Sequence, residues 1–455
     1  MIKITVPENN IHERKYILDI FFSEFLDIKY ELILNDSANK IDYWVIELEN
    51  KKKIIFEDHF FNNFCNELEY LSIENIPSKV KFFKNNFTIE ETIPSIYGSS
   101  NFLETDCEII CGVDIFASSF FMLTRWEEYV NKERDSHNRF SASNSLALKH
   151  NFLYRPIVNE YLEMLKNMIL KLNNSSVFKK RKFNFLLTHD IDYISKWDTP
   201  KKILKHLASD IIRRKSIKEF YNSIKKYLLL KLKHEKDPYD TYEYLMNISE
   251  KTGNKSYFFF MAEGLTNYDN NYNSSSDTVK NIVKKIKNRG HPIGIHPTYN
   301  AYNNKVQLAK EKKELENNFK SNISFGRQHF LRFEVPTTWQ VWEDNRMKWD
   351  STCGYADKEG FRCGVCYEYS VFNISTRQKL KLKEKPLIAM DSSFIAYQKD
   401  VSPLEIKYKI QKLINKVKKY NGDFVFLWHN SSFNIYEWRK VQNIYEKVVC
   451  ENSKN

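Results

Sequence analysis

The stretch Phe183-Asn-Phe-Leu-Leu-Thr-His-Asp-Ile-Asp192 decides the fold, because a short apolar run ends in two aspartates. An apolar run of this length between polar segments is typical of a buried β-strand. Side chains two positions apart on a strand point the same way, so Asp190 and Asp192 are expected on one face. Two carboxylates that close do not both ionise comfortably unless a cation lies beside them. The stretch therefore predicts a strand whose carboxyl end carries a metal or acid–base site.

Similar strands follow this one along the chain, separated by helices. We predict strands at 183–188, 256–261, 292–295, 386–390 and 423–428, a helix at 277–289, and a further helix that opens at Ser402-Pro403-Leu404-Glu405. That opening has a capping box and proline at the first helical position. Apolar strands that alternate with helices predict an α/β fold with a parallel sheet or barrel.

The front of the chain has a different pattern. Strands are predicted at 43–48 and 54–56, and helices at 114–126 and 155–172. The polar cluster Asn173-Asn-Ser-Ser176 is the best boundary in the chain. We therefore predict a separate α+β N-terminal domain of unknown role over 1–175 and a barrel domain over 176–455.

Composition limits the class of protein. A chain of 455 residues with 42% hydrophobic and 15% aromatic residues folds into globular domains and is not disordered. It has no apolar run of roughly 18 residues and no signal-peptide-like start, so a cytoplasmic location is expected. Seven scattered cysteines form no disulfide framework, and Cys363-Gly-Val-Cys366 has no second such pair with which to hold zinc.

The net charge of +12 is concentrated in one place. Residues 201–233 contain eleven Lys or Arg against Asp210 and Glu219, with apolar residues at helical spacing, which predicts a basic amphipathic helix or helix pair. Such a segment could contact an anionic membrane surface or nucleic acid. A solvated Lys-rich face is the favoured interpretation, and no nucleic-acid partner is expected, because aromatic residues are not interleaved for base stacking.

Polar residues also follow the other predicted strands. His296 follows Pro292-Ile-Gly-Ile295, and His429 follows the strand at 423–428. At the carboxyl edge of a parallel sheet or barrel such residues converge, whatever their distance in sequence. Histidine nitrogen with carboxylate oxygen suits zinc or a related divalent ion. A single histidine is more often a satisfied core residue, but the combination favours a site.

Four motifs in order resemble those of the polysaccharide deacetylase (NodB-homology) superfamily, carbohydrate esterase family 4. They are Thr188-His-Asp-Ile-Asp192, Gly290-His-Pro-Ile-Gly-Ile-His296, Arg332-Phe-Glu-Val-Pro336 and Phe426-Leu-Trp-His429. Further segments resemble an uncharacterised bacterial branch with an extra N-terminal domain, encoded with surface-polysaccharide genes: 93–98, 123–128, 327–332, 350–355 and 360–364. The resemblance implies a distorted (β/α) barrel of the polysaccharide deacetylase type.

The resemblance also implies roles for single residues. Asp190 would be the general base, Arg332 would pair with it, and His429 would be the general acid. The implied metal is zinc, and Asp192, His296 and Asn300 would hold it. Trp428 and Tyr355 would line the sugar site or belong to the core. The family's second motif ends in a further histidine where this chain has Asn300, a weaker zinc ligand. Either Asn300 completes the triad, or a residue such as His329 does, or metal affinity is reduced.

Three functions stay open at this point. The leading one is metal-dependent removal of an N- or O-linked acetyl group from a sugar in surface-polysaccharide biosynthesis. The expected cytoplasmic location suggests a lipid- or nucleotide-linked precursor as the substrate. The second is a catalytically weak or inactive glycan-binding or assembly protein on the same barrel. The third is a C–N hydrolase acting on a small amide, since a fold does not fix a substrate. Peripheral membrane contact through 201–233 would be compatible with any of them.

Overall fold

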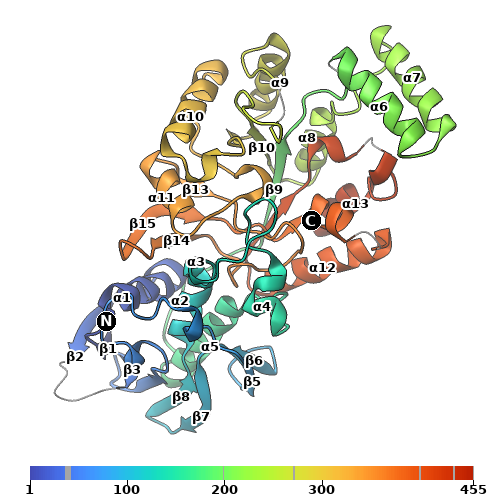
Figure 1. The fold of residues 1–455 in the computed structure, drawn as a ribbon. Coiled ribbons are helices and arrows are strands. Elements are labelled where there is room, and N and C mark those ends of the chain that lie inside the picture. Colours follow the sequence, from blue (N-terminus) through green and yellow to red (C-terminus); the bar gives the residue numbers. More distant parts are fainter. Residues whose placement is uncertain (36–41, 198, 270–271, 399–400, 434–435, 454–455) are drawn as a thin grey trace.

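The computed structural model describes residues 1–35, 42–197, 199–269, 272–398, 401–433 and 436–453. They form two mixed layers of sheet and helix, coloured blue to teal and green to red in Figure 1. No helix in these ranges is long and apolar enough to cross a membrane.

The first layer is a six-stranded sheet with parallel and antiparallel pairs. Its strands, from edge to edge, are β2 (Tyr30–Asn35), β1 (Ile2–Pro7), β3 (Tyr43–Glu47), β4 (Lys53–Glu57), β8 (Glu108–Val113) and β7 (Gly98–Glu104). A small two-stranded ribbon pairs β5 (Lys81–Lys84) with β6 (Thr92–Ser95). The helices of this layer are α1 (Ile11–Leu18), a π-helical continuation (Asp19–Leu26), α2 (Ile115–Thr124), α3 (Trp126–Val130), α4 (Leu146–Lys149) and α5 (Ile157–Leu172). The predicted strands at 43–48 and 54–56 and the helix at 155–172 are present.

The second layer is a nine-stranded sheet that is parallel from β15 to β16. Its order is β14 (Tyr369–Asn373), β15 (Gln378–Glu384), β13 (Trp349–Asp350), β12 (Phe325–Gly326), β11 (Ile293–Ile295), β10 (Ser256–Phe260), β9 (Asn184–Ile191), β17 (Asp423–Leu427) and β16 (Ala389–Met390). Its helices are α6 (Pro200–Ile212), α7 (Ile217–Lys231), α8 (Tyr242–Lys251), α9 (Asp277–Asn288), α10 (Lys305–Phe319), α11 (Thr337–Asp344), α12 (Pro403–Lys419) and α13 (Ile444–Asn452). The predicted parallel α/β sheet is confirmed, but no pairing among the described strands joins β16 to the opposite edge and closes a barrel.

Helix α2 explains how the two layers are joined. All ten of its residues are buried, and a helix that is apolar all round belongs inside a protein. It packs against α1 and α5 on the first layer and against β14 of the second. One continuous hydrophobic core therefore runs across the predicted domain boundary at 175/176, and that boundary stays a prediction.

A buried charge network lies at the end of α2. Arg125 takes a left-handed conformation (φ 55°) that splits the single helix predicted at 114–126 into α2 and α3. Its Nε donates to Glu128 Oε1 at 2.8 Å, and Arg362 Nε donates to the same oxygen at 2.9 Å. Burial alone would raise the pKa of Glu128, but Arg362 and Arg125 hold it at about 2. The network ties the first layer to the loop between β13 and β14.

Replacing Glu128 with Gln should destabilise the protein by about 3–5 kcal/mol, because two buried guanidinium groups lose their counter-charge. The depressed pKa adds a pH signature. The stabilising contribution is present above the unfolded pKa near 4.5 and is lost as pH falls toward about 2, so Glu128→Gln should flatten the acid limb of a stability–pH curve. Thermal and denaturant unfolding measure both effects. The exposed Glu133→Gln is the control, and equal stability of the two variants would contradict the role of the network.

Candidate active site and metal centre

Strand β9 extends further than predicted and presents its polar residues by alternation. It runs through Ile191, so Thr188 and Asp190 lie within the strand and Asp192 directly follows it. His189 points to the opposite face, where Nδ1 lies 2.7 Å from the carbonyl oxygen of Trp428 and Nε2 lies 2.9 Å from Ser256 Oγ. His189 is therefore a satisfied core residue, whereas the two aspartates face a common pocket.

The carboxylate of Asp190 is held by Arg327, which follows β12. Arg327 Nη1 donates to Asp190 Oδ1 at 2.9 Å and to Thr188 Oγ1 at 3.0 Å. Its Nε donates to the carbonyl oxygen of Ser351 at 2.8 Å, and its side chain is fully buried. An arginine fixed at several points orients its carboxylate partner. Arg327 thus makes the pairing that the sequence analysis predicted for Arg332.

Three residues at the base of the pocket could hold a divalent metal. Asp192, His296 and His329 each offer one ligand atom, and these atoms lie within 4.8 Å of one another. His296 Nε2 lies 3.3 Å from Asp192 Oδ1, and His329 Nε2 lies 3.9 Å from it. In the part of the chain that the structure describes, this buried Oδ1 atom has no hydrogen-bond partner. One carboxylate oxygen and two imidazole nitrogens are a suitable donor set for zinc.

Both imidazoles are oriented by a contact on the far side of the ring. His296 Nδ1 donates to the carbonyl oxygen of Arg327 at 2.7 Å, and His329 Nδ1 donates to Asp269 Oδ1 at 3.1 Å. These contacts fix the tautomer that leaves each Nε2 free to bind a metal, as the outer partners of metal-binding histidines do. Asp269 is itself fixed by Thr266 Oγ1 at 2.7 Å and by the Tyr299 amide at 2.7 Å.

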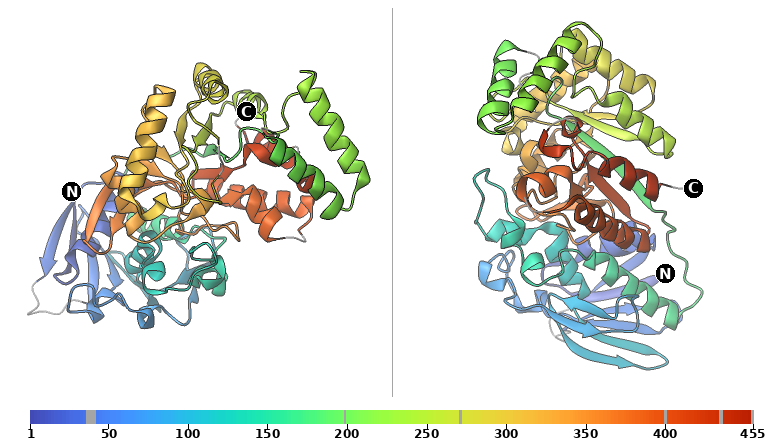
Figure 2. Two further views of the ribbon diagram at one scale, coloured as in Figure 1. Left: turned by 45° about the horizontal axis from the view of Figure 1, so that its top comes forward. Right: turned by 90° about the vertical axis from the view of Figure 1, so that its right-hand side faces the viewer.

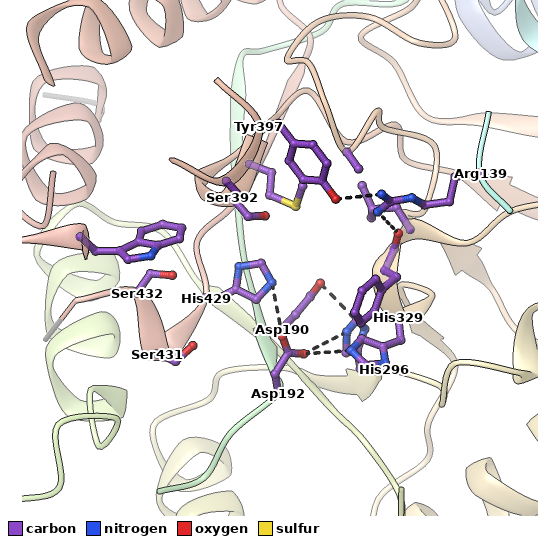
Figure 3. A pocket seen from close by; sticks show the side chains of 16 residues that line it. Arg139, Asp190, Asp192, His296, His329, Ser392, Tyr397, His429, Ser431 and Ser432 are labelled. Atoms are coloured by element: carbon purple, nitrogen blue, oxygen red, sulfur yellow. Dashed lines mark hydrogen bonds and ion pairs between the residues drawn. The ribbon is translucent and has the colours of Figure 1, made fainter. Parts of the chain in front are cut away.

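His429 lies on the other side of the aspartates, directly after β17. Asp391 accepts two hydrogen bonds from His429. Its Oδ2 accepts from the His429 amide at 2.8 Å, and its Oδ1 accepts from His429 Nδ1 at 2.7 Å. The free Nε2 points into the pocket, 3.8 Å from Asp192 Oδ2 (Figure 3). This is the geometry of an imidazole that exchanges a proton with a bound molecule.

The electrostatics of the site reflect its excess of carboxylates. Burial would lower the pKa of His429, but Asp391 and the two aspartates of β9 raise it to about 10. Burial would likewise raise the pKa of Asp192, but the imidazoles of His296, His429 and His329 hold it below its usual range. Each shift is the response of a group to charge of the opposite sign close by.

These residues line one pocket of about 270 Å³. Figure 3 shows Arg139 and Tyr397 across the opening from the aspartates, with the Arg139 guanidinium donating to the Tyr397 hydroxyl at 2.8 Å. Arg139 comes from the N-terminal layer and also donates to the carbonyl oxygen of Phe330 at 2.9 Å. Ser431, Ser432 and Trp438 also line the pocket. The pocket is therefore not made by the parallel sheet alone.

Two predicted site residues lie outside this arrangement. Arg332 donates to the carbonyl oxygen of Tyr299 at 2.6 Å, and its guanidinium lies between the rings of Tyr299 and Tyr302. Asn300 is exposed, and its Oδ1 accepts from Arg332 Nη1 at 3.2 Å. Arg332 thus stabilises a loop, and His329, not Asn300, lies with Asp192 and His296 in the group that could hold a metal.

The two aromatic residues predicted to line the sugar site are also placed elsewhere. Trp428 is buried and packs against Phe426 with a ring-centroid distance of 5.7 Å. It precedes His429, and neighbours on an extended chain point to opposite sides. Tyr355 is buried beside the charge network, where its hydroxyl accepts from Arg125 at 3.2 Å. The aromatic side chains that do line the pocket are Phe330, Tyr397 and Trp438.

Comparisons with known proteins give a partial picture. Residues 2–174 match a protein family described as a family of unknown function (DUF7033). No curated protein matches the chain.

Three similar solved structures align with about three fifths of the chain. They are a candidate polysaccharide deacetylase from Mycobacterium smegmatis (12% identity, TM-score 0.38, 60% of this chain and 84% of that one), the catalytic domain of a peptidoglycan N-acetylglucosamine deacetylase from Eubacterium rectale (13%, 0.28, 61% and 89%) and a carbohydrate esterase family 4 pseudoenzyme from Bacillus anthracis (10%, 0.29, 60% and 63%). At such low identity and TM-score, the function of this chain has to be argued from its own residues.

Zinc binding distinguishes the two candidate third ligands. His329→Ala should weaken zinc binding by at least about 100-fold, because it removes a first-sphere nitrogen, whereas Asn300→Ala should leave affinity within about twofold. Asp269→Asn should cost about 10–100-fold, because the imidazole of His329 loses its orienting partner. Calorimetric titration of zinc into metal-stripped protein measures all three. A larger effect of Asn300→Ala than of His329→Ala would contradict the proposed ligand set.

Proposed function

We propose that this protein is a metal-dependent hydrolase that removes an acetyl group from a sugar. One observation carries the proposal: three features meet at one pocket. They are the Asp190 carboxylate paired with Arg327, the three side chains that could bind a metal, and the His429 imidazole hydrogen-bonded to Asp391. The four ordered motifs that resemble those of polysaccharide deacetylases support acetyl removal over other hydrolytic reactions. Zinc is the proposed metal, because two of the three ligands are imidazole nitrogens.

The chain's own residues account for the proton movements of such a reaction. Zinc bound by the three ligands would supply Lewis acidity toward the acetyl carbonyl and lower the pKa of a water molecule. Asp190, held in position by Arg327, would accept a proton from the attacking water as it adds to the carbonyl carbon. His429 donates a proton to the departing nitrogen or oxygen of the sugar, and Asp391 keeps the ring in position. Acetate and the deacetylated sugar are the products.

The position of His329 supports an active protein over an inactive one. That alternative rested on Asn300, a weak zinc ligand, whereas His329 offers a nitrogen at the same group. Hydrolysis of a small amide remains the competing reaction, because the same groups would serve it. A role in surface-polysaccharide biosynthesis, a cytoplasmic location and a lipid- or nucleotide-linked substrate remain expectations from the sequence.

Acetate release from acetylated hexosamine oligomers tests the reaction. The zinc-loaded protein should release acetate, and chelation should abolish the release. Asp190→Asn should lower kcat by about 10²–10⁴-fold, the usual contribution of general-base catalysis, while zinc affinity changes little, because Asp190 is not one of the three ligands. Activity toward small amides without acetate release from sugars would favour the competing reaction. Acetate release by Asp190→Asn at the wild-type rate would contradict the assigned base.

Asp391 provides an independent test of the acid. Asp391→Asn keeps the size of the side chain but removes the charge behind His429, so kcat should fall by about 10–100-fold with KM little changed. His429→Ala should reduce kcat at least as far, and the double variant should be no worse than His429→Ala alone, since the two residues act as one unit. Steady-state kinetics measure these values. Additive losses in the double variant would show that the pair does not act together.

A further inference from the structure

We propose that the α6–α7 hairpin, residues 200–233, docks the protein on an anionic membrane surface. The two helices project from the rest of the molecule in Figure 1 and in the left view of Figure 2. Each is properly capped, since Thr199 Oγ1 accepts from the Lys202 amide at 3.3 Å and Ser216 Oγ accepts from the Glu219 amide at 3.3 Å. The hairpin is thus a formed element of the fold.

Large apolar side chains are exposed on both helices. Leu204 is 68% exposed, Ile212 is 75% exposed and Ile217 is 71% exposed. Four others are also exposed: Ile211 on α6, Tyr221 and Leu228 on α7, and Leu232 directly after α7. The spacings of four, seven and four from Ile217 to Leu232 place those residues in one stripe, and Leu204, Ile211 and Ile212 share one side of α6. Water is a poor solvent for two such stripes, which indicates that another surface covers them.

The charges of the hairpin identify that surface. The segment 201–233 carries eleven Lys or Arg, and its two acidic residues are both neutralised within the fold. Asp210 pairs with Arg214, and Glu219 pairs with Arg439 at 2.6 Å. Lys205, Lys218, Lys225 and Lys226 are exposed on the same two helices as the exposed aliphatic side chains. Aliphatic residues that enter the headgroup region, with lysines that attract anionic lipids, are the two features of an interfacial amphipathic helix.

The helices are packed chiefly on each other. Ser223 Oγ of α7 donates to Asp210 Oδ2 of α6 at 2.7 Å, and Trp197 meets Tyr227 edge-on at 6.2 Å. The residues that face inward, such as Ile203 and Phe220, are partly buried. The hairpin therefore keeps its own small interface, and the exposed stripes are left over after this packing is complete.

The hairpin is also linked to the wall of the pocket. Arg439 binds Glu219 of α7, and the ring of Tyr436 lies under the Arg214 guanidinium at 5.5 Å. Trp438, between these two residues in sequence, lines the pocket. A membrane bound by the hairpin would thus lie near the pocket opening. If the proposed deacetylase function holds, its substrate would be an acetylated sugar anchored to that membrane by a lipid.

Vesicle binding by the full-length protein tests the docking. Phosphatidylcholine vesicles with roughly one-third phosphatidylglycerol should bind the protein at low salt, and pure phosphatidylcholine vesicles should bind it at least about tenfold more weakly. High salt should weaken the binding to anionic vesicles, because the cations act through screened charge. Sedimentation of the protein with vesicles measures each value.

Two sets of substitutions separate the apolar and basic contributions. Leu204→Ser, Ile212→Ser, Ile217→Ser and Leu228→Ser together should reduce binding by about tenfold or more, as should Lys225→Gln, Lys226→Gln, Lys231→Gln and Lys233→Gln together. Each set has a matched control outside the hairpin that should bind as the wild type does. The control for the exposed apolar residues combines Ile89→Ser, Val177→Ser, Val306→Ser and Leu404→Ser. The control for the exposed lysines combines Lys280→Gln, Lys284→Gln, Lys310→Gln and Lys313→Gln. Circular dichroism verifies that α6 and α7 stay folded.

Three outcomes would overturn the proposal: no preference for anionic vesicles, binding that survives both hairpin sets, or equal loss in the control sets. A concentration-dependent dimer that only the serine hairpin set dissolves would also overturn it, since a second copy would then cover the stripes. Asp192→Ala separates docking from chemistry. It should abolish acetate release and leave vesicle binding unchanged, so a failure of either activity is distinguishable from a failure of the other.

Discussion

The ion pair between Asp190 and Arg327 is the interaction on which the site depends. Burying a carboxylate next to a second one is costly unless each has its own compensation. Arg327, at 2.9 Å, compensates the charge of Asp190, and the imidazoles around Asp192 compensate the charge of that second carboxylate. The parallel pairing of β9 with β10 and β17 fixes where these groups lie, because it aligns the carboxyl ends of neighbouring strands. Separate partners are what the separate roles proposed for the two aspartates require.

The charge balance of the pocket favours a bound cation. Asp190, Asp192, Asp269 and Asp391 place four carboxylates around it, and the only fully buried arginine among their partners is Arg327 in the described structure. The raised pKa of His429 lets a proton on that imidazole offset part of the remaining charge. A divalent ion among Asp192, His296 and His329 would do so, and would relieve the charge that raises the pKa of His429. Donor geometry and electrostatics therefore lead to the same conclusion.

Strand alternation and ordered motifs made much of the fold predictable. The strands at 183–188, 256–261 and 423–428 and the capped helix at 403–419 follow from local pattern, because apolar period and capping are properties of neighbouring residues. The break at Arg125 was not predictable. It depends on Arg362 and Tyr355, which lie more than 200 residues away. Closure of a barrel is likewise a long-range property, and the strands β12, β13 and β16 are only two residues long.

The site was predictable where a residue follows a strong strand. Asp190, Asp192, His296 and His429 met that condition, and Asp391 met it too, since it directly follows the predicted strand at 386–390. Arg327 and His329 lie after a two-residue strand that carries no periodic signal, so the choice between Arg327 and Arg332 needed the fold. Asp269 and Arg139 come from loops, and no pattern marks them. The alternation of side chains along a strand was enough to exclude Trp428 from the pocket lining, because Trp428 directly precedes His429, which faces the pocket.

The walls of the pocket show why the additions to the parallel sheet matter. The sheet places the acids, the imidazoles and Arg327, which could serve many hydrolytic reactions. The side chains that would select a substrate come from elsewhere: Arg139 from the N-terminal layer, Tyr397 from the segment after β16, and Trp438 from the segment that binds the α6–α7 hairpin. Arg139 reaches the pocket because the buried helix α2 and the Glu128 network fix the N-terminal layer against the sheet. The proposed substrate selection and membrane contact would therefore depend on parts of the chain outside the parallel sheet, whereas the proposed chemistry would depend on the sheet itself.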